Sequence, residues 1–413
     1  MSIISVRSIL FLGVGGVSMH QLALAFKDMG LIVYGYDLQS NQYTNKCADA
    51  GIKITNKFVR EFLNVDLCVR TAAIKDDNKY FKHLKNKKIK IIDRAEALGM
   101  LASKFKTVIA VAGTHGKSTT ASLIYEMLRV SKKKVSCHIG ADVFSPRFSL
   151  NDEYLVVEAC EYNKSFLKLY PTISVVTNIE KEHMDCYENF FDLKNSFLKF
   201  LRRAEKKFVY LDDTTKFLKK YKNISFVDKT DLSICPLIKG EHNLKNISLA
   251  IEVAKYLNIE EDIIKSVVNT FTGVPRRYEY VGRYNSSKVY IDYAHHPTEI
   301  KAFTDTFLKE NKDAVIVFQP HTYSRTKMFL KDFVKILSNI KNIIIYKEYP
   351  AREKKQCGLS AKDLYNEIKK INPQAKYCAS IKNIMKNMDD KSNIAFVGAG
   401  DIDKVAKKIV KSI

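Results

Sequence analysis

Short runs of apolar and β-branched residues recur along the chain, and longer amphipathic stretches separate them. A continuous apolar run is typical of a strand that is buried on both faces, and helical stretches between such runs favour parallel crossovers. The sequence therefore predicts an α/β fold built on parallel sheets. The predicted strands are Ser8–Gly13, Ile32–Tyr36, Leu67–Thr71, Val108–Ala112, Tyr154–Glu158, Ile173–Thr177, Val289–Ile291, Val315–Gln319, Ile343–Tyr346 and Ile394–Gly398.

A chain of 413 residues is too long for one hydrophobic core, so several domains are expected. The first break is predicted near Ser103–Lys106, just before a new strand and a glycine-rich turn. The second is predicted near Phe271–Pro275, where Gly273 and Pro275 interrupt the pattern. We therefore predict three domains, at residues 1–104, 105–272 and 273–413.

A phosphate-binding loop is predicted directly after the strand Val108–Ala112. The loop reads Gly113, Thr114, His115, Gly116, Lys117, Ser118, Thr119, and a helix is expected from Thr119–Ala121. Backbone N–H groups of such a loop cradle phosphates, with Lys117 on the β- and γ-phosphates and Ser118 on Mg²⁺. Val111 stands where the usual motif has its first glycine. The pattern indicates an ATP site, and a plain glycine turn would leave Lys117 unexplained.

Two further strand ends carry candidate metal ligands. Glu158 ends the strand Tyr154–Glu158, and His183 follows the strand Ile173–Thr177. Ligands of open α/β sheets bind at the carboxyl ends of the strands. Magnesium prefers oxygen ligands, so Ser118 and Glu158 are the predicted pair, with His183 on a second ion or a phosphate oxygen. A histidine such as His183 is also common as a surface or core residue.

The first predicted strand ends in a second glycine-rich turn, which contains Gly13, Gly15 and Gly16. Asp37 follows the next strand, near the spacing of the acid that binds ribose in dinucleotide sites. Ser18 replaces the third glycine of that fingerprint. The pattern predicts a docking site for a nucleotide diphosphate, and a tight turn without a ligand is the alternative.

Three polar stretches in the third domain also follow predicted strands, which favours a binding edge. A zinc site at the His295-His296 pair was weighed and is not favoured, because no cysteine or repeated ligand spacing lies nearby. The stretches are Tyr290–Glu299, Phe318–Arg325 and Tyr349–Glu353.

Composition narrows the class of protein. The net charge is +23, but basic residues are spread from Lys27 to Lys411, so nucleic-acid binding is not expected. The eight cysteines form no CxxC pair, and the apolar N-terminal run is too short to cross a bilayer. We expect a cytoplasmic protein with reduced thiols and no membrane insertion.

Together these motifs resemble the Mur ligase family of peptidoglycan synthesis, in order along nearly the whole chain. The stretch Asp292–Glu299 and the stretch Phe318–Arg325 are similar to the branch that adds L-alanine and to a related branch that takes a tripeptide. The matching stretches are Gly13–Met19, Arg94–Glu96, Gly113–Thr120, Glu158–Glu161, Thr177–Tyr187, Gly240–Asn243, Gly273–Gly282, Asp292–Glu299, Phe318–Thr326, Tyr349–Lys354 and Gly398–Ile402.

The resemblance implies a Rossmann-like UDP-substrate domain, a central P-loop ATPase domain and a Rossmann-like C-terminal domain. It implies ligation of L-alanine to the carboxylate of UDP-N-acetylmuramate through an acyl phosphate, with ATP and Mg²⁺, by a monomer or dimer. Lys117, Glu158 and His183 are then the catalytic residues, and Ser118, Glu158 and His183 the metal residues. The further residues it implies are Gly15, Gly16, Asp37 and Thr71 for UDP; Asn243, Arg277, Asp292 and His295 for ATP; and His321, Arg325 and Arg352 for the amino acid.

The chain departs from the family in its first loop, where Ser18, His20 and Gln21 replace glycine and small residues. The stretch Leu201–Leu237 is shorter than in most relatives, and Lys194 is not claimed as a carbamylated lysine. Three other classes of protein fit the sequence less well. A nicotinamide-dependent oxidoreductase leaves Lys117 and Glu158 without a role, and a P-loop enzyme acting on nucleic acid is favoured only by charge. A non-catalytic homologue conflicts with the intact Lys117, Glu158 and His183.

Overall fold

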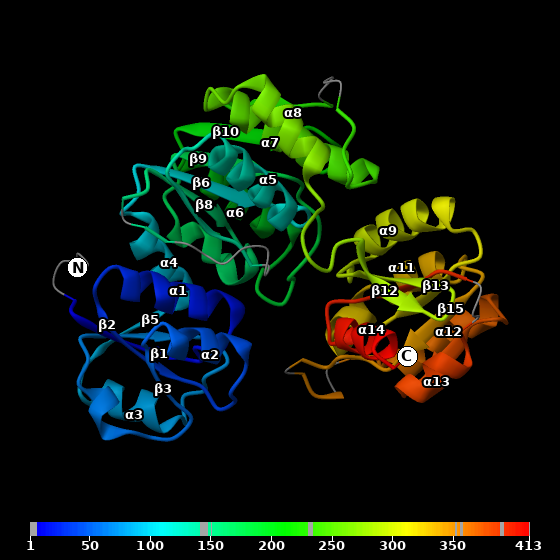
Figure 1. Ribbon diagram of the computed structural model, residues 1–413, viewed down its shortest axis with the longest axis horizontal. Coiled ribbons are helices and arrows are strands. Elements are labelled where there is room, and N and C mark those ends of the chain that lie inside the picture. The colour runs from blue at the N-terminus through cyan, green and yellow to red at the C-terminus, as the bar shows by residue number, and fades with distance from the viewer. Residues whose placement is uncertain are drawn as a thin grey trace. The chain divides into compact units, whose positions relative to one another are not determined.

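The computed structural model describes residues 6–140, 148–149, 151–229, 234–351, 353–355, 358–388 and 392–412. Its strands form three sheets, one after another along the chain (Figure 1). Contacts divide the chain into two compact units, residues 1–236 with 243–271, and residues 237–242 with 272–413. The first two sheets lie in the first unit. The α/β fold with three domains is confirmed, and the two domain boundaries given above stay a prediction.

The first sheet has five parallel strands in the order β3-β2-β1-β4-β5. Side chains on both faces of β1 are buried, which explains its uninterrupted apolar run. Helix α4 begins with a capping box, because Asp93 and Glu96 satisfy each other's backbone N–H groups. The elements are β1 Ser8–Leu12, α1 Val17–Asp28, β2 Ile32–Tyr36, α2 Gln42–Asp49, β3 Lys53–Thr55, β4 Leu67–Arg70, α3 Lys79–Asn86, β5 Lys90–Asp93 and α4 Arg94–Ala102.

The second sheet has six parallel strands in the order β11-β10-β9-β6-β8-β7. Its central strand β6 carries the predicted phosphate loop, and α5 begins at Lys117, two residues before the predicted start. The elements are β6 Thr107–Ala112, α5 Lys117–Val130, β7 Val135–His138, β8 Tyr154–Glu158, β9 Ile173–Val176, α6 Phe190–Arg202, β10 Lys206–Tyr210, β11 Ser225–Val227, α7 Glu241–Tyr256 and α8 Glu261–Thr270.

The third sheet has the order β12-β13-β17-β14-β15-β16, and only the β12–β13 pair is antiparallel. Alternate residues of β14 pack on opposite faces: Ile316 against α9, α11 and α12, and Val317 against α13 and α14. The elements are β12 Glu279–Tyr284, β13 Ser287–Asp292, α9 Pro297–Glu310, β14 Val315–Phe318, α10 Tyr323–Met328, α11 Leu330–Leu337, β15 Ile343–Tyr346, α12 Ala361–Ile371, β16 Lys376–Cys378, α13 Ile381–Lys386, β17 Ile394–Val397 and α14 Ile402–Val410.

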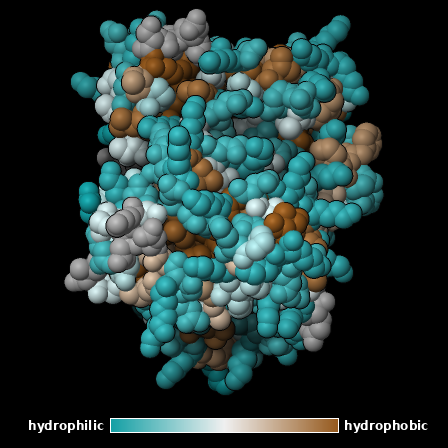
Figure 2. Space-filling view, turned by 90° about the vertical axis from the view of Figure 1, so that its right-hand side faces the viewer, coloured by the Kyte–Doolittle hydropathy of each residue, from teal (hydrophilic) through white to brown (hydrophobic). Residues whose placement is uncertain are grey.

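All ten predicted strands are present within a residue or two of their predicted ends. Seven other strands of the described residues were not predicted, namely β3, β5, β7, β10, β11, β12 and β16. The antiparallel strand β12, for example, has residues that are largely polar or partly exposed and form no apolar run. Figure 2 shows hydrophilic side chains over most of one face, with hydrophobic ones in small groups. Among the described residues, no helix is both long enough and apolar enough to cross a membrane.

Candidate active site

The predicted phosphate loop and Glu158 lie at one edge of the second sheet. Val111 of β6 pairs with Glu158 of β8 on one side, and Ala112 pairs with Val176 of β9 on the other. The three strands are parallel neighbours, so the segments that follow them emerge together (Figure 1). The sheet thereby brings residues from three separate stretches of sequence to the start of α5.

At the two glycines of the loop, neighbouring atoms leave no room for a side chain. Gly113 has a φ of +140° and Gly116 a φ of +83°, a region that side chains rarely adopt. A Cβ at Gly113 would lie 1.9 Å from Oγ1 of Thr177, and one at Gly116 would lie 2.1 Å from Oδ1 of Asn246. Asn246 lies one helical turn after Asn243 on α7, so the start of α7 belongs to this site.

Polar groups in the segment that follows β9 form hydrogen bonds to the phosphate loop. The backbone N–H of His115 donates to Oδ1 of Asn178 at 2.9 Å, and the side chain of Asn178 donates back to the His115 carbonyl at 3.1 Å. Thr177 also donates to the His115 carbonyl, and Oγ1 of Thr114 accepts from the backbone of Glu180 at 2.8 Å. The segment that follows β9 therefore holds the phosphate loop in its conformation through these hydrogen bonds. Sequence analysis did not single out Thr177 and Asn178 for this role.

Lys117 lies in a cage of oxygen atoms. Its Nζ donates to the carbonyls of Gly113, at 2.5 Å, and Thr114, at 3.0 Å, and it lies 3.1 Å from Oε2 of Glu161. The Lys117 and Glu161 side chains are only 13% and 2% exposed. Burial alone would lower the pKa of Lys117, but the negative charges of Glu161 and Glu158 outweigh it and raise that pKa. Lys117 therefore stays a cation, beside a carboxylate that sequence analysis missed.

Ser118 and Glu158 meet as predicted. The Ser118 hydroxyl donates to Oε2 of Glu158 at 2.9 Å, and the backbone N–H of Gly140 donates to the same oxygen at 2.9 Å. Hydroxyl and carboxylate oxygens are the donors that Mg²⁺ prefers. The residues present therefore fit a magnesium ion bound by Ser118 and Glu158.

His183 has a φ of +55°, so its backbone is in the left-handed region. Its Nε2 lies 3.8 Å from Oε1 of Glu161, and Tyr162 packs edge-on against its ring. Tyr187 donates a hydrogen bond to the backbone carbonyl of Glu161. The structure thus groups His183 with Lys117 around Glu161. The stretch Glu158–Glu161 contained the only sequence signal for this carboxylate.

The predicted UDP residues come together in the first domain. The backbone N–H of Gly15 donates to Oδ2 of Asp37 at 2.8 Å, and Asn41 donates to the Gly15 carbonyl at 3.0 Å. Thr71 packs against Gly13, where a Cβ would lie 2.1 Å from its methyl carbon. Gly16 is exposed at the N-terminus of α1, next to this cluster. The carboxyl ends of β1, β2 and β4 thus bring all four predicted residues to one place.

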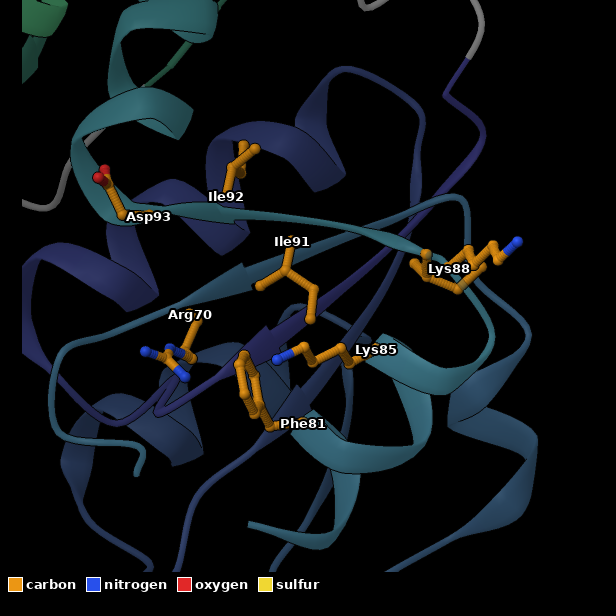
Figure 3. Close-up of a pocket in the computed structure, with 8 residues that line it drawn as sticks. Arg70, Phe81, Lys85, Lys88, Ile91, Ile92 and Asp93 are labelled. Carbon is orange, nitrogen blue, oxygen red and sulfur yellow. The ribbon is translucent and has the colours of Figure 1, made fainter. Parts of the chain in front are cut away.

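A pocket of about 430 Å³ lies beside this cluster, over the edge strand β5 (Figure 3). The guanidinium of Arg70 stacks on the ring of Phe81 at 4.1 Å and pairs with Asp76 at 2.6 Å. Lys85 points into the same space. None of the predicted site residues lines this pocket, although Thr71 directly follows Arg70.

The predicted residues of the third domain form their own network. Arg277 donates to Oε1 of Glu299 at 3.1 Å, and Nδ1 of His295 lies 3.2 Å from Oε2 of Glu299. Asp292 accepts from the backbone N–H groups of Tyr278, at 2.8 Å, and Ala294, at 2.7 Å. Burial raises the pKa of Asp292 to about 6, although the charge of Arg277 opposes the shift. Glu299 connects the two predicted residues Arg277 and His295, although it was not itself predicted as a site residue.

His321 and Arg325 also meet in the third domain. Nη1 of Arg325 lies 2.8 Å from Nδ1 of His321, and the His321 ring stacks on Tyr349. The rings of His321 and His295 are 6.0 Å apart, so this pair adjoins the network around Glu299. Arg352 was also predicted here, and it lies outside the described residues.

Three protein-family models match the chain in sequence order. They are the Mur ligase family catalytic domain over residues 8–106, the Mur ligase middle domain over 111–235, and the Mur ligase glutamate ligase domain over 276–400. Two curated relatives are both named UDP-N-acetylmuramate–L-alanine ligase. The one from Caldicellulosiruptor saccharolyticus is 37% identical, over 97% of each chain. The one from Clostridium perfringens is 32% identical, over 98% of each.

Solved structures share the fold. UDP-N-acetylmuramate–alanine ligase from Thermotoga maritima gives a TM-score of 0.82 at 22% identity, over 98% of each chain. A murein peptide ligase from Psychrobacter arcticus gives 0.69 at 19% identity, again over 98% of each. FolC from Escherichia coli, solved in complex with ADP, gives 0.58 at 13% identity, over 77% of this chain and 92% of that one. Because the family models match most of its length and relatives match it from end to end, the chain belongs to the Mur ligase family.

Proposed function

We propose that this chain joins L-alanine to the carboxylate of UDP-N-acetylmuramate at the expense of ATP, a cytoplasmic step of peptidoglycan synthesis. The observation that carries the proposal is the end-to-end match, at 31–37% identity, to relatives that carry this activity in their name. The clustering of Lys117, Ser118 and Glu158 at one sheet edge supports it, since these groups suit a nucleotide and its metal.

In this proposal the loop Gly113–Thr119 cradles the phosphates of ATP at the N-terminus of α5. Backbone N–H groups there carry partial positive charge, and Lys117 adds a full one. Ser118 and Glu158 would hold Mg²⁺, which would neutralise charge on the phosphates. His183 would meet the transferred phosphoryl group or a second ion. Lys117 must leave the Gly113 carbonyl to do this, and Glu161 can hold it nearby as it turns.

The UDP end of the substrate is assigned to the first domain. Gly15 and Gly16 lie at the N-terminus of α1, which suits a pyrophosphate, and Thr71 lies beside them. Asp37 follows β2, where its carboxylate can accept from a ribose hydroxyl in addition to the Gly15 N–H. We assign Asn243, Arg277, Asp292 and His295 to the nucleotide, and His321, Arg325 and Arg352 to the amino acid.

The chemistry requires activation, because a carboxylate has no adequate leaving group. Its oxygen attacks the γ-phosphorus of ATP, ADP leaves, and an acyl phosphate forms. The amine of L-alanine then attacks the acyl carbon, and the tetrahedral intermediate expels inorganic phosphate to leave an amide. Both reactants of the first step are anions, so fixed cations such as Lys117 lower the barrier by screening their repulsion.

Phosphate release from ATP tests the proposal. The protein is incubated with Mg²⁺ and UDP-N-acetylmuramate, and L-alanine, glycine, L-serine and the tripeptide L-Ala-γ-D-Glu-diamino acid are supplied in turn. We expect release that requires both the UDP-sugar and L-alanine. Release with the tripeptide alone would move the chain to the peptide-recycling branch. No release with any acceptor would contradict the proposed ligation.

A further inference from the structure

Three consecutive residues at the carboxyl end of β7 contact both the first and the second domain. The side chain of His138 lies 2.8 Å from the hydroxyl of Ser18, and the Ile139 carbonyl accepts from the amide of Gln21 at 3.1 Å. The N–H of Gly140 donates to the carboxylate of Glu158 at 2.9 Å. The segment His138–Gly140 therefore connects helix α1 to Glu158, and we call it the β7 bridge.

The α1 end of the bridge belongs to the predicted pyrophosphate site. Ser18 lies on the first turn of α1, two residues after Gly16. Its hydroxyl also accepts from Nη1 of Arg94, at the start of α4, at 3.0 Å. Arg94 can only donate, so the proton of Ser18 is free to point to His138. The first turn of α1 is thus tied to β7 through a side chain whose position a second element fixes.

The other end of the bridge belongs to the phosphate edge. Oε2 of Glu158 accepts from both Gly140 and Ser118, so two hydrogen bonds hold this oxygen in position. Groups that hydrogen-bond to a metal-binding carboxylate orient it and tune its affinity. A shift of the β7 bridge would move the Gly140 N–H and turn Glu158 with it.

Burying the polar side chains of the β7 bridge costs folding free energy, which packing alone would not require. His138 is 2% exposed and Gln21 is also 2% exposed. Nδ1 of His138 and Oε1 of Gln21 are buried and have no hydrogen-bond partner among the residues that the structure describes. Burial, with the nearby Arg94 and His20, lowers the pKa of His138 to about 3, so its ring is neutral at physiological pH. Apolar side chains would fill this junction without an unsatisfied polar group.

We propose that the β7 bridge sets the distance between the pyrophosphate site and the metal-binding carboxylate, with Ser18 and His138 as positioning residues that act through Glu158. The inference rests on the proposed function, in which one rigid sugar-lactyl unit must reach from the Gly15–Gly16 turn to the reacting phosphate. Two sites on two sheets can bind the ends of such a substrate only if their separation is fixed.

Two variants break the bridge without touching Glu158. Ser18→Ala removes the hydroxyl from a partly exposed position on a helical turn, and His138→Phe keeps a ring but removes the acceptor nitrogen. Ser18→Thr retains the hydroxyl and should restore the contact. Ser103→Ala is the matched control, because its hydroxyl donates to the backbone carbonyl of Met100 within the same end of α4. Thermal unfolding of each variant checks that the fold is intact.

The first measurement is a Mn²⁺ titration of the full chain in the presence of a non-hydrolysable ATP analogue. Electron paramagnetic resonance detects the Mn²⁺ that stays unbound. We expect Ser18→Ala and His138→Phe to weaken Mn²⁺ binding by at least about threefold, since losing a group that orients a metal ligand costs about 10- to 100-fold in metal affinity. Ser18→Thr and Ser103→Ala should bind as the wild type does. Unchanged Mn²⁺ affinity in both broken variants would overturn the proposal and leave the bridge a packing contact.

The second measurement separates positioning from substrate affinity. In the ligation assay, Ser18→Ala should lower kcat by about the same factor as Mn²⁺ affinity, while KM for UDP-N-acetylmuramate changes less than about twofold. A rise in KM with kcat unchanged would instead make Ser18 a substrate contact and refute the positioning role. If the wild type releases no phosphate, the proposed function fails, but the Mn²⁺ titration still decides the bridge because it needs no turnover.

Discussion

The second and third sheets both gather charged residues at the carboxyl ends of parallel strands, but they treat those charges differently. At the phosphate edge, Glu161 raises the pKa of the buried Lys117, so the cation is held charged. At the edge of the third sheet, burial raises the pKa of Asp292 to about 6 despite Arg277, so ionising this carboxylate costs more free energy in the folded protein than in the unfolded chain. The edge of the second sheet thus presents a cation to an anionic ligand before the ligand binds. At the edge of the third sheet, a ligand that supplies a hydrogen-bond donor or a cation would stabilise the charged form of Asp292.

The largest effect should come from removing the cation of the phosphate edge. Lys117→Ala should lower turnover by at least about two orders of magnitude, as loss of a preorganised charge does in other transfer reactions. Steady-state phosphate release measures it. Lys265→Ala is the control, since Lys265 forms its ion pair with Glu261, one turn earlier on α8. A Lys117→Ala rate above about a tenth of wild type would mean that the lysine is not the phosphate clamp.

Two lysine–glutamate pairs sharpen the comparison between buried and exposed charge. Glu161→Gln leaves Lys117 buried without its carboxylate and should lower the free energy of unfolding by about 3 kcal/mol. Glu261→Gln breaks an exposed pair with Lys265 and should leave that free energy unchanged within error. Urea titration of both variants measures the difference. Equal losses would show that Glu161 does not hold a buried cation.

Asp292→Asn tests whether ionising the carboxyl group of Asp292 destabilises the folded protein. The folded-state pKa of Asp292 is raised to about 6 from 3.8, so the folded protein binds this proton more tightly than the unfolded chain does. The stability that this group contributes is therefore present below pH 3.8 and is lost as pH rises through about 6. The difference in unfolding free energy, wild type minus variant, should fall by roughly 2–3 kcal/mol between pH 4 and pH 7. A difference that is flat or rises with pH would contradict the raised pKa.

Gly116→Ala tests how tightly the phosphate edge is preformed. Gly30 is a matched control, because its φ of +84° equals that of Gly116 within a degree, but a Cβ there would meet nothing within 4 Å. Both variants carry the backbone strain, whereas only Gly116→Ala collides with Asn246. We expect calorimetric affinity for a non-hydrolysable ATP analogue to fall at least about tenfold for Gly116→Ala alone. Equal affinities for the two variants would mean that the loop adapts.

Sequence reasoning located the parts of the site that depend on local order. The P-loop places Lys117 and Ser118 by spacing alone, and strand-end logic placed Glu158 beside them. Glu161 was missed because its contact with Lys117 spans 44 residues and follows from an irregular turn in which Asn163 and Lys164 both have positive φ. No periodicity predicts such a turn.

Long-range polar contacts were the other gap. The hydrogen bond between Ser18 and His138 joins residues 120 positions apart, one on helix α1 and the other on strand β7. The pairing of Arg277 with Glu299 likewise depends on how β12 and α9 pack. The central strands could be predicted because burial on both faces gives them an uninterrupted apolar run, whereas partly exposed strands such as β3, β12 and β16 show no such run. Partners of single polar side chains leave no comparable local pattern.

The central claim, that ATP activates the substrate carboxylate, is tested most directly with UDP-N-acetylmuramate labelled with ¹⁸O in its carboxylate. An acyl phosphate transfers one carboxylate oxygen to phosphorus, so the phosphate released with L-alanine should carry one ¹⁸O atom. Mass spectrometry of that phosphate is the measurement. Unlabelled phosphate would contradict the account, and ¹⁸O recovered in AMP would show activation at the α-phosphorus instead.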